Sequence, residues 1–363
     1  MITRTSQSIR IHDLLYLLYI LPSFPVIIFP MPDSIIAIDG HTLVPDASLP
    51  DEVNWSAIQA LGSLTVYDRT PSAALLLERM RGCPIVLTNK VAFSAEILAK
   101  LPELKYIGVT ATGTNIIDLQ AAKARKVVVT NVPGYGAASV AQHVFALLLE
   151  LANHVGAHNM AVRPTQGYAG WPGASDWCFT VGPLVELADK TLGIVGLGAI
   201  GQRVAQIGAA LGMRIAAAHQ RSMRETRIEG IEIEWLPVDE LFAKSDVVTL
   251  HCPLTETTKQ MVNAKRLATM KSGAFLINTG RGGLIDEAAL ASALREGKLA
   301  GAAVDVLSTE PPSAENPLLT APRCIITPHV AWASVEARRR LMQIAAGNIR
   351  AFQLGKPVNV VNG

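Results

Sequence analysis

The feature that most constrains this chain is a glycine-rich segment at residues 191–201, TLGIVGLGAIG. An apolar run leads into three glycines and an amphipathic run follows them, which predicts a buried strand, a tight turn and a helix. The first glycine permits the turn, the second lets a pyrophosphate approach the backbone, and the third lets the helix pack closely on the strand. Phosphates would then lie at the helix N-terminus, where N–H groups and the helix dipole favour negative charge. The predicted dinucleotide contacts are Gly196, Gly198, Ala199, Ile200 and Gly201.

Length and composition exclude several classes of protein. A chain of 363 residues predicts about two domains, and 50% hydrophobic with 17% charged residues is unlike a disordered chain. The formal net charge of +2 argues against a nucleic-acid-binding face and against a polybasic membrane patch. The cysteines are widely spaced, and no Cys/His cluster suggests a metal ligand set. We therefore expect a reduced, cytoplasmic protein without a metal.

The N-terminal segment at residues 11–29, IHDLLYLLYILPSFPVIIF, is apolar enough to suggest a signal peptide or a membrane span. Against this, Asp13 lies inside the segment, Pro22 and Pro25 interrupt it, and no small-residue cleavage site follows. After Met31 the sequence SIIAIDG predicts a first strand. We interpret residues 1–33 as an extension outside the fold, with translation starting at Met31; a targeting or anchoring segment is the alternative.

Short apolar runs alternate with helical patterns along the rest of the chain, which predicts parallel βαβ units and an α/β fold. Residues 34–132 contain five such runs, and the pattern resumes after the glycine motif, from MRIAAA to CIITP. Between the two series, residues 139–159 predict one long helix buried between domains. Residues 162–183 predict a long loop that carries Trp171 and Trp177, of the kind that packs against a partner subunit.

Three polar residues follow three consecutive apolar strands: Arg281 after GAFLINTG, Glu310 after GAAVDVLST and His329 after CIITP. Ligands bind beyond the carboxyl ends of the strands in doubly wound sheets, so the three are expected at one site. An arginine can hold a carboxylate or polarise a carbonyl. A histidine can give or take a proton, and a neighbouring carboxylate favours its charged form. Beside a nicotinamide this set predicts hydride transfer on an oxo-acid, although each residue alone would also fit a surface or capping role.

Several motifs in series, GLGAIG, HCPLTETT, INTGRGGLID, AAVDVLSTEPP and TPHVAWASVEAR, resemble those of the D-2-hydroxyacid dehydrogenase family. The resemblance extends from about residue 34 to residue 362 and is strongest to the glycerate dehydrogenase/hydroxypyruvate (glyoxylate) reductase branch. It implies two Rossmann-like, doubly wound parallel-sheet domains with the active site in the cleft between them. The expected boundaries are 34–132 plus 333–363 for the substrate-binding domain and 133–332 for the NAD(P)-binding domain.

The resemblance also implies catalytic and cofactor contacts. Arg281 would bind the carboxylate and keto oxygen of a small 2-oxo acid. His329 would donate the proton that gives the D-2-hydroxy acid, and Glu310 would keep His329 protonated and oriented. The expected cofactor contacts in these motifs are Cys252, Pro253, Thr257, Thr279, Gly280, Arg281, Asp305 and His329.

Further substrate contacts are expected from the first domain. By the same resemblance, the loop VTATGTNIID would bind the substrate carboxylate through backbone N–H groups near Thr112 and Gly113. Lys90, in LTNK, would either add a charge there or be an ordinary solvated lysine. Trp332, just after His329, would either wall the substrate pocket or lie at a hinge or an interface.

The end of the second strand after the glycine motif bears on cofactor preference. NAD-binding folds place Asp or Glu there to bond the ribose 2′-hydroxyl. Here the position is His219, followed by Arg221 and Ser222, which would suit a 2′-phosphate. We therefore expect NADP(H) to be preferred; the alternative is a solvated loop and an enzyme that accepts NAD as well.

Rival functions on the same fold remain. A formate-dehydrogenase-like activity is disfavoured because Glu310 stands where that branch has Gln. A phosphoglycerate-type dehydrogenase is disfavoured because the chain ends at Gly363 without a regulatory domain. The alternative from another class is a dinucleotide-responsive, corepressor-like sensor, although no nucleic-acid-binding extension is evident. The expected partners are a small 2-oxo or 2-hydroxy acid and a second copy of the chain, with neither nucleic acid nor membrane.

Overall fold

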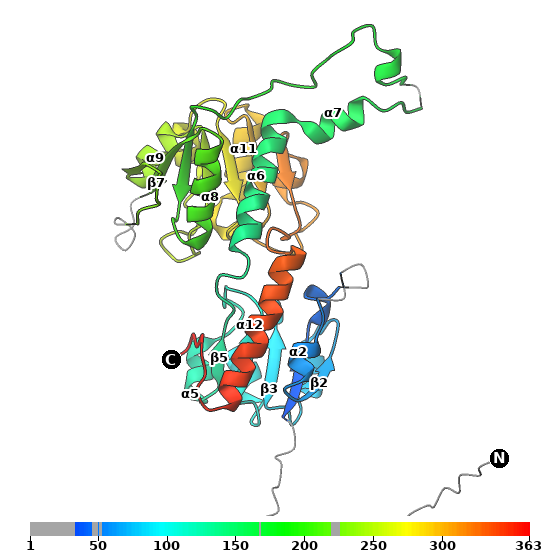
Figure 1. The fold of residues 1–363 in the computed structure, drawn as a ribbon, viewed down its shortest axis with the longest axis vertical. Coiled ribbons are helices and arrows are strands. Elements are labelled where there is room, and N and C mark those ends of the chain that lie inside the picture. The colour runs from blue at the N-terminus through cyan, green and yellow to red at the C-terminus, as the bar shows by residue number, and fades with distance from the viewer. Residues whose placement is uncertain (1–32, 46–49, 51–52, 167, 219–225) are drawn as a thin grey trace, which may run out of the picture.

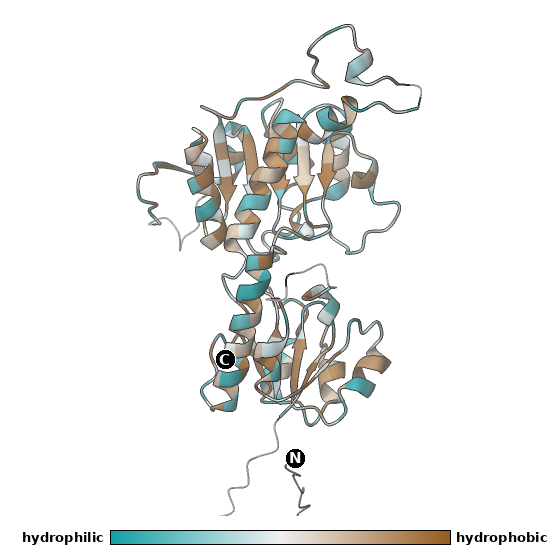
Figure 2. Cartoon of the chain, turned by 45° about the vertical axis from the view of Figure 1, so that its right-hand side comes forward, coloured by the Kyte–Doolittle hydropathy of each residue, from teal (hydrophilic) through white to brown (hydrophobic). Residues whose placement is uncertain are grey.

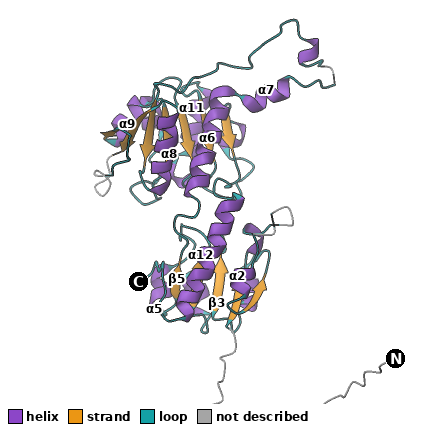
Figure 3. Cartoon of the chain, in the orientation of Figure 1, coloured by secondary structure: helices purple, strands orange, loops and turns teal. Residues whose placement is uncertain are grey.

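The computed structural model describes residues 33–45, 50, 53–166, 168–218 and 226–363. It contains two parallel β-sheets, each covered by helices, which lie one above the other in Figure 1. Figure 3 shows the strands inside each layer and the helices outside. The N-terminal segment discussed above lies outside the described residues, and so do the residues expected to choose between cofactors, His219, Arg221 and Ser222.

The five-stranded domain is built on the sheet order β2-β1-β3-β4-β5. Its central strands β3 and β4 are fully buried, as a parallel sheet covered on both faces requires. The last helix of the chain, α12, packs against β4 and α2, so a segment far away in the sequence completes this domain. The strands are β1 (Ser34–Ala37), β2 (Ser63–Val66), β3 (Ile85–Thr88), β4 (Tyr106–Val109) and β5 (Val128–Thr130). The helices are α2 (Ser56–Gln59), α3 (Ala73–Arg79), α4 (Ala95–Ala99), α5 (Leu119–Ala124) and α12 (Val335–Gln353).

The seven-stranded domain has the order β12-β11-β10-β9-β6-β7-β8, with every strand pair parallel. Figure 2 shows that hydrophobic residues concentrate on the strands of both sheets. The strands are β6 (Thr191–Val195), β7 (Arg214–Ala218), β8 (Ile233–Leu236), β9 (Val247–Leu250), β10 (Phe275–Asn278), β11 (Gly301–Val304) and β12 (Cys324–Ile326). The helices are α6 (Ala137–Asn153), α7 (Val155–Ala161), α8 (Ala199–Ala210), α9 (Val238–Lys244), α10 (Ala264–Thr269) and α11 (Glu287–Arg295). Short 3-10 turns are η2 (Gly40–Thr42), η3 (Trp171–Gly173), η4 (Gly282–Leu284) and η5 (Pro317–Thr320).

Each sheet has one point where the strand order reverses. In the seven-stranded sheet β6 lies between β7 and β9, and in the five-stranded sheet β1 lies between β2 and β3. At such a point the two following connections leave in opposite directions and open a crevice beyond the strand ends. The sequence prediction of two doubly wound α/β sheets is therefore confirmed, and each sheet offers one crevice.

The single long helix expected for residues 139–159 is wrong in two respects. His154 adopts a left-handed conformation (φ 51°) and ends α6, after which α7 starts in a new direction (Figure 1). The buried face of α6 packs on α8, β10 and β11 of the seven-stranded domain and not between the two domains. The apolar pattern continues through His154, so periodicity alone could not show the break.

Residues 155–184, which we name the arm, extend from the end of α6 and return to β6 (Figure 1). The arm carries several exposed large apolar side chains, and Trp177 is 87% exposed. Among the described residues, no helix combines the length and the apolar character that a membrane crossing would need.

Candidate functional site

A cavity of about 390 Å³ opens where the two domains meet and is lined from both. The seven-stranded domain contributes the start of α8 and the loops after β9, β10, β11 and β12. The five-stranded domain contributes the loops after β3 and β4. The cavity brings together, from the predicted site, Lys90, Thr112, Gly113, Gly198, Ala199, Ile200, Thr279, Arg281, Asp305, His329 and Trp332.

The glycine motif forms a close-packed cradle at the reversal point of the seven-stranded sheet. Gly196 has φ 103°, and a Cβ atom there would lie 2.6 Å from the carbonyl carbon of His251. A Cβ atom on Gly201 would clash with the carbonyl oxygen of Gly196. The N-terminus of α8 at Gly198 has no acidic residue in its first turn and lines the cavity. This geometry fits a dinucleotide phosphate, which needs close backbone approach and N–H donors.

Two buried polar atoms in this cavity have no hydrogen-bond partner among the described residues: His251 Nδ1 and Thr279 Oγ1. His251 Nε2 lies 2.9 Å from the hydroxyl of Thr249. Burial lowers the pKa of His251 to about 3, so its imidazole is neutral at physiological pH. Orphaned polar atoms beside the cradle fit the amide and hydroxyl groups of a nicotinamide nucleoside.

Arg281 reaches from the loop after β10 to the loop after β4 in the other domain. A Cβ atom on Gly113 would clash with Nη2 of Arg281, so only glycine permits this approach. Nη1 of Arg281 donates to its own neighbour, the carbonyl of Gly280, at 2.8 Å. Thr112 donates its hydroxyl to the carbonyl of Val132 at 3.0 Å, which fixes the facing loop. The guanidinium and the Gly113 backbone therefore face the cavity together.

His329 and Glu310 form a close pair. Nδ1 of His329 lies 2.6 Å from Oε2 of Glu310. Burial works against the charge of Glu310, but the hydrogen bond and the charge of His329 outweigh it and lower the pKa of Glu310. A charged carboxylate only accepts, so Nδ1 carries a hydrogen and donates it. Nε2 is then the atom of His329 that can exchange a proton with a ligand.

Asp305 holds the loop that carries His329. It is 1% exposed, and its carboxylate accepts from the Thr327 hydroxyl at 2.6 Å and from the N–H groups of Val330 and Ala331 at 2.9 Å. The Asp305 carbonyl also accepts from the N–H of His329 at 2.8 Å. His329 has φ 56°, a conformation that costs a non-glycine residue about 1 kcal/mol. These contacts offset that cost, a role that the motif alone did not predict.

Lys90 crosses the interface between the domains. Its Nζ lies 3.3 Å from Nδ1 of His329 and 3.9 Å from Oε2 of Glu310. The Lys90 side chain is 47% exposed, so it is neither buried nor a free surface lysine. Of the two interpretations considered from sequence, its position favours a charge at the site over a solvated loop residue.

Trp332 lines the cavity and is held on both sides. Its ring makes an edge-to-face contact with Tyr135 at 6.0 Å, and the Arg338 guanidinium lies 4.7 Å from its ring centre. Arg338 is itself fixed by the carbonyls of Thr42 and Leu43. Tyr135 also lines the cavity, and burial raises its pKa to about 12, so it is neutral. Tyr135 could not be predicted from the sequence, because it lies in a loop without a recognisable motif.

The remaining predicted cofactor residues that the structure describes do not line the cavity. Cys252 is buried, and its backbone packs against Gly196. The carbonyl of Pro253 accepts from Thr258, and the exposed Thr257 contacts Thr255 within the same turn after β9. Gly280 donates its N–H to the side chain of Asn278.

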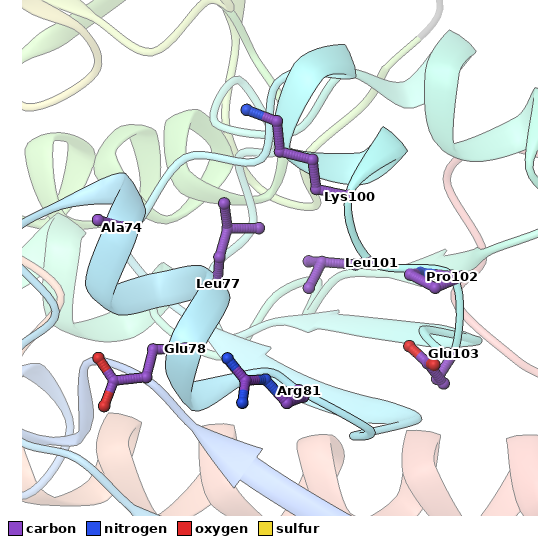
Figure 4. Close-up of a pocket in the computed structure, with 8 residues that line it drawn as sticks. All are labelled: Ala74, Leu77, Glu78, Arg81, Lys100, Leu101, Pro102 and Glu103. Carbon is purple, nitrogen blue, oxygen red and sulfur yellow. The ribbon is translucent and has the colours of Figure 1, made fainter.

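A second hollow, of about 580 Å³, lies in the five-stranded domain between α3 and the segment after α4 (Figure 4). Its charged lining residues are two acidic and two basic side chains, and none of the predicted site residues is among those that line it. The lining residues are Ala74, Leu77, Glu78, Arg81, Lys100, Leu101, Pro102 and Glu103.

Comparison with known proteins identifies similar chains over nearly the whole fold. The family described as "D-isomer specific 2-hydroxyacid dehydrogenase, NAD binding domain" matches residues 145–331. A hydroxypyruvate reductase of Blautia hydrogenotrophica is 43% identical over 330 residues, covering 90% of this chain and 99% of that protein. A glycerate dehydrogenase of Methylorubrum extorquens is 40% identical over 297 residues, covering 81% and 90%. The solved NADPH-dependent glyoxylate/hydroxypyruvate reductase of Sinorhizobium meliloti, in complex with NADP and malonate, has a TM-score of 0.75 and 29% identity, covering 91% and 97%.

Proposed function

Since this chain belongs to the D-isomer-specific 2-hydroxyacid dehydrogenase family and is an NAD(P)-dependent enzyme of that family, we propose that it reduces small 2-oxo acids of the hydroxypyruvate and glyoxylate type. The products are 2-hydroxy acids, of the D configuration where the carbon is chiral. The observation that carries the proposal is the meeting of Arg281, His329 and the Gly113 loop at one cavity beside the glycine cradle.

Arg281, His329 and Glu310 have separate roles in the reaction. The Arg281 guanidinium binds the carboxylate and polarises the keto oxygen, because its forked donors match two oxygens. His329 donates from Nε2 to the keto oxygen and takes the proton back in the reverse direction. Glu310 fixes the tautomer and favours the imidazolium through the 2.6 Å contact. A nicotinamide held beside the glycine cradle would supply the hydride chemistry.

We expect NADP(H) to be preferred over NAD(H). The support is the sequence His219–Ser222, which offers a guanidinium and a hydroxyl and no carboxylate. The substrate is small, because Trp332 is clamped between Tyr135 and Arg338 and cannot swing aside without breaking both contacts. We assign residues 34–132 with 333–363 to the substrate-binding domain and 133–332 to the cofactor domain. Closure of the cleft between them would exclude water from the reacting atoms.

The enzyme is also proposed to be a cytoplasmic homodimer. All four cysteines are free, which suits a reducing compartment. The arm exposes an apolar set that a partner subunit would cover: Val155, Met160, Tyr168, Trp171, Trp177, Val181 and Leu184. In light scattering after size-exclusion chromatography we expect twice the chain mass of 38.7 kDa, and Trp177→Ser should shift the mass towards a single chain. A wild-type mass of one chain would refute the dimer.

The proposed function is tested by initial rates with NADPH and with NADH against hydroxypyruvate, glyoxylate and pyruvate. His329→Ala should reduce turnover to background while NADPH still binds, because the imidazole acts on the substrate and not on the cofactor. Wild-type-like kcat in this variant would refute the assignment of His329. A wild-type protein that binds NADPH without turning over any of the three acids would instead indicate a different oxo-acid substrate or a dinucleotide sensor.

A further inference from the structure

We propose that Lys90 is a positioning residue that acts across the cleft on the proton donor: it shares the Glu310 carboxylate with His329 and weakens the hold of that carboxylate on the His329 proton. The inference rests on the proposed function, because it concerns the same proton. It assigns the five-stranded domain an active part in the protonation of a residue that belongs to the other domain.

The geometry allows Nδ1 of His329 only one partner for its hydrogen. Glu310 Oε2 lies 2.6 Å away and accepts, whereas Lys90 Nζ lies 3.3 Å away and can only donate when charged. Lys90 therefore does not hydrogen-bond to a protonated Nδ1. It places a second positive charge beside the imidazolium and a second cation, at 3.9 Å, on the same Oε2. A like charge disfavours the imidazolium, so Lys90 acts against Glu310.

The position of Lys90 is fixed by the fold. It lies in the turn after β3, at the point where the strand order of the five-stranded sheet reverses. The buried carboxylate of Asp39, after β1, accepts from the backbone N–H groups of Asn89 at 2.8 Å, Lys90 at 2.6 Å and Val91 at 3.2 Å. Asn89 also donates its side-chain amide to the carbonyl of Thr110 at 2.6 Å. The backbone that carries Lys90 is thus tied to both neighbouring strand ends.

The other charged groups around His329 come from three further elements. Arg281 follows β10, Glu310 and Asp305 follow β11, and His143 on α6 bonds the Thr327 hydroxyl at 3.1 Å. Burial lowers the pKa of Lys90, the charge of Glu310 opposes this and Arg281 adds to it. The Asp305 carboxylate accepts from the backbone N–H groups of residues 330 and 331, and it is not part of the contact between Lys90 and Glu310.

The arrangement couples acid strength to domain closure. A less tightly held proton moves more readily to a keto oxygen as negative charge develops there. Lys90 and Glu310 belong to different domains, so their 3.9 Å contact depends on how closely the two domains meet. A wider cleft would separate Lys90 from Glu310 and so remove the effect of Lys90 on the His329 proton.

The test measures the His329 titration directly, by NMR of the full chain with ¹³C-labelled histidine, with and without NADP⁺. The His329 resonance is assigned by its loss in His329→Gln. Lys90→Met should raise the midpoint of this titration, and the pH at which the reduction rate falls, by about one unit, because the repelling charge is gone. Lys90→Arg should stay close to wild type, and Glu310→Gln should move both values downwards. Lys105→Met, which removes a lysine elsewhere in the same domain, serves as the matched control and should change neither.

The outcomes separate this inference from the proposed function. An unchanged titration in Lys90→Met, accompanied only by a higher KM, would overturn the inference and make Lys90 a direct substrate contact. If the wild type turns over no oxo-acid, the proposed function fails, but the NMR titration still decides whether Lys90 acts on His329. Lys90→Gln provides the same charge removal should the Met variant fold poorly.

Discussion

Asp39 and Asp305 occupy equivalent places in the two domains. Asp39 follows β1 and turns its carboxylate towards the loop after the neighbouring strand β3, which carries Lys90. Asp305 follows β11 and does the same for the loop after β12, which carries His329. Both are buried, at 7% and 1% exposure. In each sheet a buried carboxylate from a neighbouring strand end thus accepts hydrogen bonds from backbone N–H groups of a functional loop. Without it, those N–H groups would need water as their partner.

The two aspartates differ in how they distribute their hydrogen bonds. Asp305 uses both oxygens: Oδ1 accepts from Thr327 and Val330, and Oδ2 accepts from Ala331. Asp39 concentrates its acceptors on Oδ2, which accepts from Asn89, Lys90 and Val91, whereas the Oδ1 contact is to Asn89, at 3.0 Å. Burial raises the pKa of Asp39, although the N–H groups around it act in the opposite direction. Only the loop of Asp305 carries a left-handed, non-glycine backbone at its functional residue. We therefore expect the loop after β12 to require both oxygens of Asp305, whereas one well-placed oxygen of Asp39 nearly suffices for the loop after β3.

The largest expected effect comes from the matched pair Asp305→Asn and Asp39→Asn. In Asp305→Asn one oxygen becomes an NH₂ group that faces an N–H donor, which should lower the free energy of unfolding by about 3 kcal/mol. Displacement of His329 should lower kcat about a hundredfold. In Asp39→Asn the remaining oxygen can take the place of Oδ2, so we expect a loss of about 1 kcal/mol and a small change in kcat. Urea unfolding and steady-state rates measure both effects.

The alanine variants are the control for this pair. Asp305→Ala and Asp39→Ala remove both carboxylate oxygens at each site, so the difference between the two sites should shrink. The contrary outcome is that Asp39→Asn lowers the free energy of unfolding and kcat as much as Asp305→Asn does. The number of accepting oxygens would then not distinguish the two sites, and both loops would require the negative charge itself.

The smallest expected effect comes from removing one hydroxyl at each site. Thr327 donates to Asp305 at 2.6 Å, whereas Thr88 lies 3.3 Å from Asp39 and also 3.0 Å from the carbonyl of Val91. Thr327→Val should cost about 1 kcal/mol of unfolding free energy and lower kcat a few-fold. Thr88→Val should cost less than half of that and leave kcat unchanged.

Serine variants serve as the control here, because Thr327→Ser and Thr88→Ser keep the hydroxyl and lose only a methyl group. A larger loss of stability in Thr88→Val than in Thr327→Val would contradict the ranking of the two contacts by length.

Much of the fold was predictable because its signals are local. Buried strands of a parallel sheet are continuous apolar runs, and the glycine motif fixes the strand–turn–helix at residues 191–210 by backbone geometry alone. The convergence of Arg281 and His329 on one cavity also followed from sequence, since parallel strands end at the same edge. The helix break at His154 did not, because the apolar pattern continues across it.

The sequence by itself determined the two doubly wound sheets, the dinucleotide cradle and the family, since each depends on residues close together along the chain. Only the tertiary structure decided that Lys90 faces His329, 239 positions away, and that Asp39 holds the turn of Lys90 from 51 positions away. Such contacts depend on strand order and on how the domains meet, which no local pattern encodes. A lone aspartate after a strand looks the same in the sequence whether it caps a turn, binds a ligand or orients a catalytic loop.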